Sequence, residues 1–234
     1  MKTLSIVIPV YNEERFIEKT IQAVQSAPAL HLEKEIIIVD DGSTDATASL
    51  LEKYKTYAGM RVLIHPANRG KGAALKTGFL ASSGDIVVVK DADLEYSPDD
   101  LPVLLEPFLK QGADVVYGSR FISDRPHRVL YFWHAVANKL LTLCSNMLTN
   151  LTLTDMETGY KAFRGEIIRA LAPKLQSERF GFEPEITARL SKIKGIRFYE
   201  VGISYEGRTY EEGKKITWRD GLAALWYILR FTLG

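Results

Sequence analysis

The chain has 234 residues, of which 46% are hydrophobic and 25% are charged, and its formal net charge is +1. This composition is typical of a folded globular protein and excludes a disordered chain. The small net charge gives no reason to expect nucleic-acid binding. The single cysteine, Cys144, excludes an internal disulfide and a cysteine-rich metal site.

Hydropathy limits the relation of the chain to a membrane. No apolar run approaches the ~20 residues that a transmembrane helix requires. The first apolar run ends at Pro9, which is too short for a signal peptide, and it leads directly into a strand pattern. We therefore expect a cytoplasmic chain that is at most peripheral to a membrane.

Strand-like and helix-like segments alternate through the first half of the chain. Apolar, β-branched runs predict strands over residues 4–10, 36–39, 62–64, 86–89 and 115–117. Polar or glycine-containing segments predict helix starts near Asn12, Ser43, Gly70 and Ser97. Because strands and helices alternate, we predict an α/β fold with a doubly wound, largely parallel sheet.

Three acidic side chains follow the strand pattern at residues 86–89. Successive strand residues point to opposite faces, so Asp91 and Asp93 would project together, with Glu95 following if the extended conformation continues. Ligands of open α/β sheets bind at the carboxyl ends of the strands, and Mg²⁺ and Mn²⁺ prefer carboxylate oxygens. The segment therefore predicts a divalent-cation site, although an isolated Asp-x-Asp is more often a solvated loop.

Polar residues suited to a nucleotide diphosphate follow the first two strands. Tyr11 could stack on a base, and Glu13 and Asp41 could accept hydrogen bonds from a ribose or a base. Each has a simpler alternative when taken singly: Tyr11 as a packing residue, and Glu13 as a charge favoured at a helix start.

The segment 68–72, Asn-Arg-Gly-Lys-Gly, combines glycines, two cations and an expected helix N-terminus. All three features favour an anion, so Lys71 is a candidate phosphate ligand. The spacing is not that of a P-loop. A phosphate cradle and a simple helix-start loop both remain open.

The second half departs from this alternation. Residues 128–150 carry an apolar stripe at helical spacing and a second, polar stripe along another face. The apolar stripe consists of Val129, Phe132, Val136, Leu140, Leu143 and Met147, and the polar stripe of His134, Asn138, Thr142 and Ser145. One interpretation is a helix facing the core. The other is a helix in a membrane interface, which Arg128, Tyr131 and Trp133 would suit.

A second apolar stripe lies at the C-terminal end of the sequence. Its members are Trp218, Leu222, Leu225, Leu229 and Leu233. Residues 217–220 are typical of a capped helix start, and the helix is shorter than a membrane span. We expect it to rest on lipid or on a partner chain. Between the two stripes, a further helix is predicted from Phe182 and a strand over residues 197–203.

Taken together, these motifs resemble the inverting nucleotide-sugar glycosyltransferases with a GT-A fold. The shared segments occur in the same order and spacing, at residues 9–13, 40–45, 68–72, 91–93 and 118–120. Within that family the chain is similar to the polyprenyl-phosphate sugar synthases, the dolichyl-phosphate mannose and glucose synthase group. The resemblance covers nearly the whole chain and is specific as a set.

The resemblance implies a role for each matching residue on the donor side. The residues that would contact the nucleoside are Pro9, Tyr11, Glu13, Val39 and Asp41. Asp91 and Ala92 would lie near the sugar nucleotide, and Asp93 and Glu95 would hold Mg²⁺ or Mn²⁺. A Gln is common at the position of Glu95 in the mannose synthases, so this site is more anionic.

Further roles follow from the same resemblance. Arg208 and Lys214 would belong to a loop that closes over the donor pyrophosphate; without the family, this is an exposed mixed-charge loop. Arg120 and Arg128 would hold the acceptor phosphate. Asp155 would either accept hydrogen bonds from sugar hydroxyls or act as a general base.

The expected function is metal-dependent transfer, with inversion, of a hexose from a UDP- or GDP-hexose donor to a polyprenyl (dolichyl) phosphate. The acceptor phosphate has a second pKa of about 6, so no side chain has to remove a proton from it. We expect one continuous catalytic domain with a nucleotide-sugar half (1–120) and an acceptor half (121–234), bound peripherally to the cytoplasmic face of a membrane. Two alternatives are a transferase with a hydroxyl acceptor and a non-catalytic nucleotide-binding protein.

Overall fold

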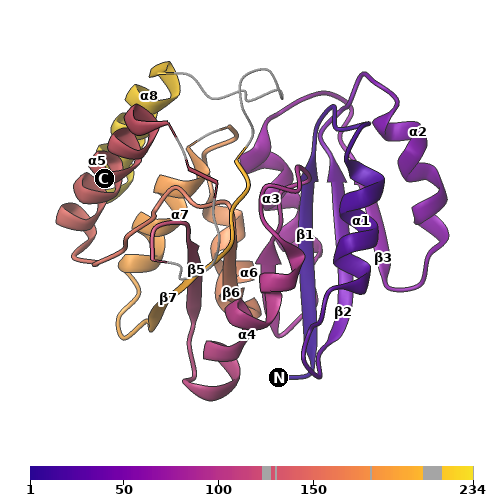
Figure 1. The fold of residues 1–234 in the computed structure, drawn as a ribbon, viewed down its shortest axis with the longest axis horizontal. Helices are drawn as coiled ribbons and strands as arrows, with labels where there is room; N and C mark the ends of the chain where they lie inside the picture. The colour runs from indigo at the N-terminus through magenta and orange to yellow at the C-terminus, as the bar shows by residue number, and fades with distance from the viewer. Residues whose placement is uncertain (123–127, 130, 180, 208–217, 234) are drawn as a thin grey trace.

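The structure is a computed structural model that describes residues 1–122, 128–129, 131–179, 181–207 and 218–233. These residues form one seven-stranded sheet with helices on both faces (Figure 1). The strands are β1 (Thr3–Val10), β2 (Glu33–Asp40), β3 (Met60–Ile64), β4 (Ile86–Val89), β5 (Val115–Ser119), β6 (Lys161–Arg164) and β7 (Phe198–Gly202). The α-helices are α1 (Ile17–Ser26), α2 (Thr47–Leu51), α3 (Lys71–Ala81), α4 (Leu101–Lys110), α5 (Phe132–Thr149), α6 (Gly165–Leu171), α7 (Phe182–Ser191) and α8 (Trp218–Leu233).

The strand order is β3-β2-β1-β4-β6-β5-β7. Strand β6 runs antiparallel to both of its neighbours, β4 and β5, and the other pairs are parallel. The prediction of a doubly wound, largely parallel sheet is confirmed. The sequence pattern gave no sign of β6, because its four residues, Lys-Ala-Phe-Arg, contain only two apolar side chains.

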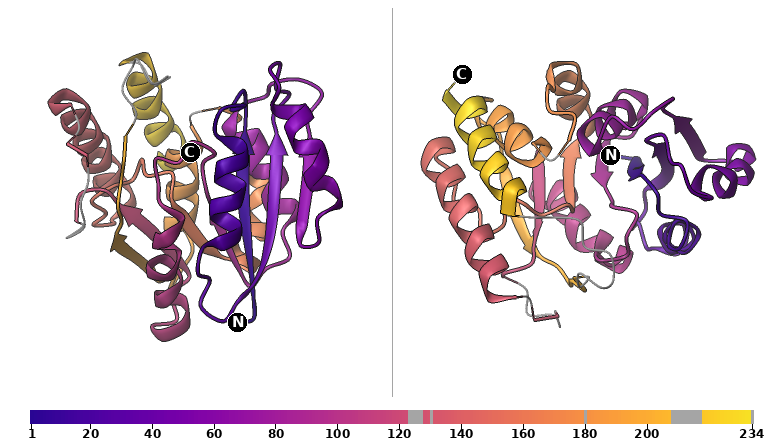
Figure 2. Two further views of the ribbon diagram at one scale, coloured as in Figure 1. Left: turned by 45° about the vertical axis from the view of Figure 1, so that its right-hand side comes forward. Right: turned by 90° about the horizontal axis from the view of Figure 1, so that it is seen from above.

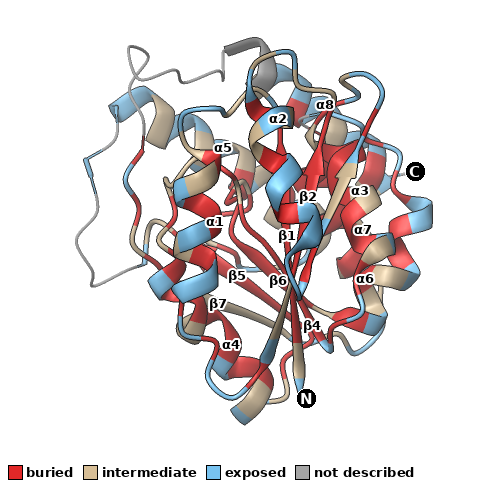
Figure 3. Ribbon diagram, turned by 90° about the vertical axis from the view of Figure 1, so that its right-hand side faces the viewer, coloured by how far each residue is buried: buried red, intermediate tan, exposed pale blue. Residues whose placement is uncertain are grey.

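Two hydrophobic layers enclose the sheet, one on each face. The alternate residues Leu4, Ile6 and Ile8 of β1 pack with α1 and α4, whereas Val7 faces the layer that contains α3, α6 and α7. Figure 3 shows the strands buried at the centre and the outer faces of the helices exposed. Strands covered on both faces must be apolar throughout, which explains why the runs in β1, β2 and β4 were predictable.

The carboxyl ends of the parallel strands meet at one edge of the sheet. Val10 lies beside Asp40 in the register of β1 and β2, and the backbone N–H of Lys90 continues the ladder by donating to the carbonyl oxygen of Val7. The polar residues that follow β1, β2 and β4 therefore lie together at this edge, which is the usual ligand-binding edge of such sheets.

Helices α5 and α8 pack side by side, with α7 against α8 (Figure 2). The polar stripe of α5 is the buried one: Thr142 is 3% exposed and Ser145 is 2% exposed. The hydroxyl of Thr142 accepts a hydrogen bond from the backbone N–H of Met156. The side-chain amide of Asn146 both donates to and accepts from the backbone of Leu153. These contacts explain why polar residues face inward.

The apolar stripe of α5 faces outward, so the core-facing interpretation is wrong for this stripe. Its exposed members are Val136, Leu140, Leu143 and Met147 on the helix, preceded by Val129 and Phe132. On α8 the exposed apolar residues are Leu222, Leu225, Trp226, Leu229 and Leu233, while the side chain of Trp218 lies outside the described part. We call these eleven exposed side chains, together with Trp133, the α5/α8 face. Within the described residues, no helix is long and apolar enough to cross a membrane.

Candidate functional site

The five residues predicted to contact a nucleoside lie at the carboxyl ends of β1 and β2. Tyr11 is 37% exposed. Pro9 and Glu13 are half-buried. The side chain of Val39 is completely buried in the core, so a ligand could meet it only through its backbone. Contact with a nucleoside stays a prediction for this group.

Asp41 holds the segment 68–72 in place. Its buried carboxylate accepts hydrogen bonds from the backbone N–H groups of Arg69, at 3.1 Å, and Gly70, at 2.6 Å. It also lies 2.6 Å from Nδ1 of His65, whose other ring nitrogen is 2.9 Å from the hydroxyl of Thr77. These partners give Asp41 a positioning role beside its predicted nucleoside contact.

The segment 68–72 is the start of a helix, as the helix-start interpretation predicted. Helix α3 begins at Lys71, and the φ of +105° at Gly70 favours glycine. A Cβ at Gly70 would lie only 2.4 Å from the carbonyl oxygen of Glu178, so this loop packs closely on the segment before α7. A phosphate cradle stays a prediction.

Lys71 joins this helix start to the acidic end of β4. Its ammonium lies 3.0 Å from the carboxylate of Asp91 and 3.0 Å from that of Glu183. Burial lowers the pKa of Lys71, but the two carboxylates outweigh burial and raise it well above its usual value. Burial raises the pKa of Asp91, against the opposing charge of Lys71. Lys71 is therefore a permanent cation that bridges two acidic residues.

Glu183 is a residue that the sequence reasoning missed. It lies in the first turn of α7 and is 6% exposed. An acidic residue there has a simple explanation in the helix dipole, so the helix was given only a structural role. The one feature of the sequence that could have indicated a further role for this helix start is a second glutamate, Glu185, two residues later. In the structure the carboxylate of Glu185 accepts hydrogen bonds from the backbone N–H groups of Gln176 and Ser177.

Asp93 and Glu95 lie in a tight turn after β4. The strand ends at Val89 and Leu94 has a φ of +58°, so the extended conformation that was assumed for Glu95 does not continue. Instead, the backbone N–H of Glu95 donates to Oδ1 of Asp93 at 3.2 Å. Both residues therefore lie in one turn, and a shared cation site stays a prediction.

The donor set of this turn suits a divalent cation. Two partly exposed carboxylates supply hard oxygen ligands, and Mg²⁺ usually fills its remaining positions with water and substrate phosphates. Among the described residues no group of three or more His, Cys, Asp or Glu could hold a metal. Within that part of the chain, a cation at Asp93 and Glu95 would complete its coordination with water or substrate oxygens.

Arg120 and Asp155 form a bidentate ion pair at the end of β5. Nε and Nη2 of Arg120 donate to the two carboxylate oxygens of Asp155 at 2.6 and 2.7 Å, and the backbone N–H of Arg120 donates at 3.1 Å. Asp155 is completely buried. Its two predicted roles, sugar contact and general base, remain predictions, and the geometry adds a third: it positions Arg120.

Arg128 lies beside the same site. Its backbone N–H donates to the carbonyl oxygen of Tyr205 at 3.0 Å, and its Nη1 donates to that of Gly207 at 2.9 Å. Arg208 and Lys214, predicted to clamp the donor pyrophosphate, lie outside the described residues.

The segment 154–160 passes between the two ends of the site. A Cβ added to Gly159 would lie 2.2 Å from the carboxylate of Asp91, so a larger residue there would displace Asp91. Glu157 is half-buried, and its Oε1 is enclosed without a hydrogen-bond partner among the described residues. Burial, followed by repulsion from Glu183, raises the pKa of Glu157 to about 8. Burial lowers the pKa of the neighbouring Lys161 to about 8.

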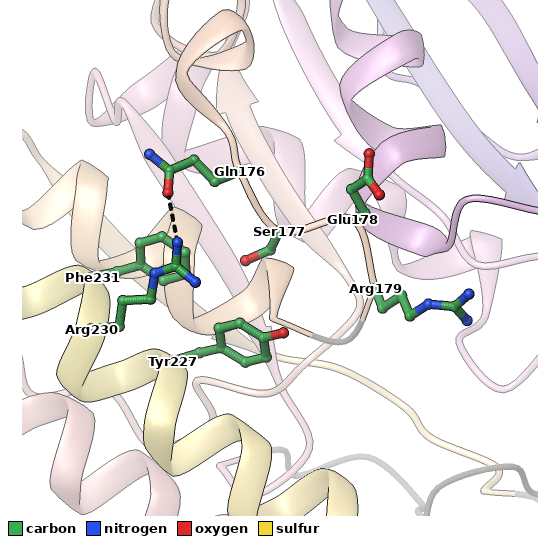
Figure 4. Close-up of a pocket in the computed structure, with 7 residues that line it drawn as sticks. All are labelled: Gln176, Ser177, Glu178, Arg179, Tyr227, Arg230 and Phe231. Carbon is green, nitrogen blue, oxygen red and sulfur yellow. Dashed lines mark hydrogen bonds between the residues drawn. The ribbon is translucent and has the colours of Figure 1, made fainter.

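A separate pocket of about 290 Å³ opens between α8 and the segment before α7 (Figure 4). Arg230 crosses it and donates to the side-chain oxygen of Gln176 at 3.3 Å. The residues that line it are Gln176, Ser177, Glu178, Arg179, Tyr227, Arg230 and Phe231. None of them is a predicted site residue, and we assign this pocket no part in the chemistry.

The fold and the site together define a class. Acidic residues, a half-buried lysine and an arginine held by an ion pair lie at the carboxyl edge of a mostly parallel sheet, which is the GT-A arrangement of nucleotide-sugar glycosyltransferases. Glucosyl-3-phosphoglycerate synthase from Mycobacterium tuberculosis has this fold: its structure with Mn²⁺, UDP and phosphoglyceric acid matches with a TM-score of 0.73 at 24% identity, over 99% of this chain and 78% of that one. Its structure with Mg²⁺ and UDP matches with a TM-score of 0.71 at 25% identity, over 99% and 79%.

The sequence gives the family. Residues 5–171 match the profile of Glycosyl transferase family 2. The chain belongs to this family and is a glycosyltransferase, so the alternative of a non-catalytic binding protein is set aside.

The chain is also similar to several proteins that are named as polyprenyl-phosphate sugar transferases. Undecaprenyl-phosphate mannosyltransferase from Micrococcus luteus is 32% identical over the full length of both chains. Dolichol-phosphate mannosyltransferase from Pyrococcus furiosus is 28% identical, over 91% of this chain and 60% of its own length. Undecaprenyl-phosphate 4-deoxy-4-formamido-L-arabinose transferase from Proteus mirabilis is 32% identical, over 90% and 62%.

Proposed function

We propose that the protein transfers a hexose from a nucleotide-diphosphate donor to a polyprenyl phosphate, with inversion and with a divalent cation. The names of its relatives support the acceptor class. The observation that carries the proposal is the ion pair between Arg120 and Asp155. An arginine fixed by a buried carboxylate is suited to a phosphate, whereas a hydroxyl acceptor would require that carboxylate to be available as a base.

The acceptor side needs charge rather than a base. A phosphate monoester is largely dianionic at neutral pH, because its second pKa is about 6. Asp155 occupies Nε and Nη2 of Arg120, so we assign Nη1 to the acceptor phosphate. Arg128, held by the backbone at residues 205 and 207, would supply a second positive charge.

The donor side stabilises the leaving group. Attack of a phosphate oxygen on the anomeric carbon, opposite the nucleoside diphosphate, breaks the anomeric C–O bond and inverts the configuration. When bound at Asp93 and Glu95, the cation supplies positive charge to the leaving diphosphate. Lys71, which remains charged between Asp91 and Glu183, adds to that field.

We place the protein at the cytoplasmic face of a membrane, and the α5/α8 face supports the peripheral contact with lipid. Trp133 is 75% exposed and Trp226 is 61% exposed, and aromatic side chains on an apolar helix face are typical of an interface with lipid. A polyprenyl phosphate carries its phosphate at that interface. The face would therefore bring the site to its acceptor.

The direct test is transfer of labelled sugar. Labelled UDP- or GDP-hexose is incubated with the protein, Mn²⁺ and polyprenyl phosphate, and the organic extract is assayed for a product that mild acid cleaves. We expect label in that fraction only when polyprenyl phosphate is present. Label that moves to a hydroxyl-bearing glycan instead would favour the hydroxyl-acceptor alternative.

A pair of variants distinguishes the two acceptor classes by mechanism. Arg120→Ala should raise the acceptor KM at least 10-fold or stop transfer, because it removes the charge that holds the phosphate. Asp155→Asn should lower the rate by loosening Arg120 but should keep any acidic limb of the pH–rate profile, because that limb belongs to the acceptor phosphate. Loss of both activity and limb in a folded, donor-binding Asp155→Asn protein would overturn the phosphate mechanism.

A further inference from the structure

Tyr205, which belongs to none of the motifs of the sequence, links the two ends of the site. It follows β7 and is 5% exposed. Its hydroxyl donates to Oε2 of Glu95 at 2.8 Å. Its ring centroid lies 5.2 Å from the guanidinium carbon of Arg120. One aromatic side chain thus contacts both a candidate cation ligand and the candidate acceptor arginine.

The backbone around Tyr205 reinforces this link. Tyr205 forms an antiparallel bridge with Tyr96, and the next residue, Glu206, donates its N–H to the carbonyl oxygen of Glu95 at 2.9 Å. The carbonyl oxygen of Tyr205 accepts from the N–H of Arg128 at 3.0 Å. The turn after β4 and the segment that carries Arg128 are therefore fixed to the same residue.

The rings below Tyr205 limit its freedom. Its ring lies 5.2 Å from that of Tyr96, at 46°, and Tyr96 in turn receives a hydrogen bond from the backbone N–H of Gly159. A fixed donor on one oxygen of Glu95 restricts the rotation of that carboxylate, and a ring beneath a guanidinium restricts Arg120.

We propose that Tyr205 is a positioning residue that couples cation binding at Glu95 to acceptor-phosphate binding at Arg120. This inference rests on the proposed function, because it takes the cation and the acceptor phosphate from it. Because one ring contacts both Glu95 and Arg120, a ligand that fixes one of these side chains in its binding conformation also favours the matching conformation of the other. The two ligands should consequently strengthen each other's binding, and by an equal factor in each direction.

The test measures binding rather than turnover. Titration calorimetry gives the Kd for Mn²⁺ in the presence of UDP or GDP, with and without a short, soluble isoprenyl phosphate such as farnesyl phosphate. In the wild type we expect each ligand to tighten the other about 5-fold or more. Tyr205→Phe removes only the hydroxyl, so it should weaken Mn²⁺ about 5- to 20-fold and abolish the coupling while leaving the metal-free farnesyl phosphate Kd within 2-fold. Tyr199→Phe, on β7, is the matched control.

Two further variants sharpen the result. Tyr205→Leu also removes the ring, so it should additionally weaken farnesyl phosphate; if it does not fold, Tyr205→Phe still decides the question. Glu95→Gln combined with Tyr205→Phe should be non-additive for Mn²⁺, because the two side chains act through one hydrogen bond.

The proposal is overturned if Tyr205→Phe binds Mn²⁺ as the wild type does, if the double variant is additive, or if the wild type shows no coupling between the ligands. These results are distinct from a failure of the proposed function. Absent sugar transfer to polyprenyl phosphate, together with an intact Tyr205→Phe effect on Mn²⁺ and on coupling, would remove the acceptor assignment and keep the positioning role. A wild type that binds no Mn²⁺ would overturn both.

Discussion

The acidic residues after β4 differ in how much the fold depends on them. Asp91 is paired with the half-buried Lys71, whereas Asp93 lies in the partly exposed turn that follows. Asp93→Ala should therefore abolish transfer and metal-dependent donor binding but change the free energy of unfolding by only about 1 kcal/mol or less. Calorimetry with Mn²⁺ and nucleoside diphosphate, alongside urea unfolding, checks both.

Asp99→Ala is the control for that experiment, since Asp99 is an exposed acidic residue nearby in the sequence. It should bind Mn²⁺ and turn over as the wild type does. Near-wild-type turnover in Asp93→Ala would exclude Asp93 as a ligand.

Glu157 should make stability depend on pH. In the folded state burial raises its pKa from 4.5 to about 8. Between these values the folded protein holds a proton that the unfolded chain releases, so this group's stabilisation is complete below pH 4.5 and is lost as the pH rises to 8. In Glu157→Gln this loss should be absent. The free energy of unfolding of the variant, relative to that of the wild type, should therefore be roughly 1–3 kcal/mol more favourable at pH 8 than at pH 5.

Urea unfolding at pH 5, 6.5 and 8 measures the difference. Lys161 acts in another window: its lowered pKa, about 8 against 10.5, makes stability rise from pH 8 upward. The control is Glu166→Gln on α6, where the side chain is exposed. If the difference in free energy of unfolding between Glu157→Gln and the wild type is the same at all three pH values, the prediction is contradicted.

The sequence indicated candidate site residues but not the residues that they contact. Asp91 and Arg120 each follow a strand that its apolar pattern reveals, whereas the roles of Arg120 and Asp155 were expected only from the family resemblance. That Arg120 pairs with Asp155 depends on residues 35 positions apart. The contact of Tyr205 with Glu95 spans 110 positions. Such pairs arise from the order of strands in the sheet, which hydrophobic periodicity does not encode.

Among the elements, strands buried on both faces were predictable and the short antiparallel strand was not. All four residues of β4 are buried β-branched residues, so their pattern has one interpretation. In β6 the buried Lys161 interrupts the pattern, since its ammonium donates to the carbonyl oxygens of Met156 and Thr158. A buried lysine with backbone partners cannot be predicted from hydrophobic patterns, because these patterns assume that charged side chains are exposed.

The helical periodicity predicted for α5 was correct, but the sequence did not show which of its two faces is buried. Its buried side chains are polar because they hold the segment 153–156, which leads into the site. The exposed apolar stripe therefore has another purpose. Leu143→Glu should reduce flotation with anionic vesicles at least 10-fold, because it places a charge in the centre of the α5/α8 face.

Leu80→Glu on α3 is a matched control, since Leu80 is 53% exposed and Leu143 is 55% exposed. It should float as the wild type does. High salt should weaken, without abolishing, the wild-type binding. A wild type that remains in solution with vesicles at low salt would contradict the interface role.

At the scale of the whole molecule, the sheet ties the two halves of the chain together. Within the described residues, β5 pairs only with β6 and β7, which both come from beyond residue 120. A fragment of residues 1–120 would thus leave β5 without a partner and β4 with an open edge. We expect the fragment to lose structure gradually in urea, whereas the full chain unfolds in one cooperative transition followed by far-UV circular dichroism.

A cooperative transition in the fragment would show that the donor half is an independent folding unit. The division at residue 120 would then be structural as well as functional.

The α5/α8 face also governs how the protein behaves in dilute buffer. With a formal net charge of +1, two copies repel each other only weakly near neutral pH. Without lipid to cover it, this broad apolar surface is the part of the molecule most prone to self-association. Preparations made without detergent or vesicles should accumulate reversible clusters held face to face, and a mild detergent should disperse them.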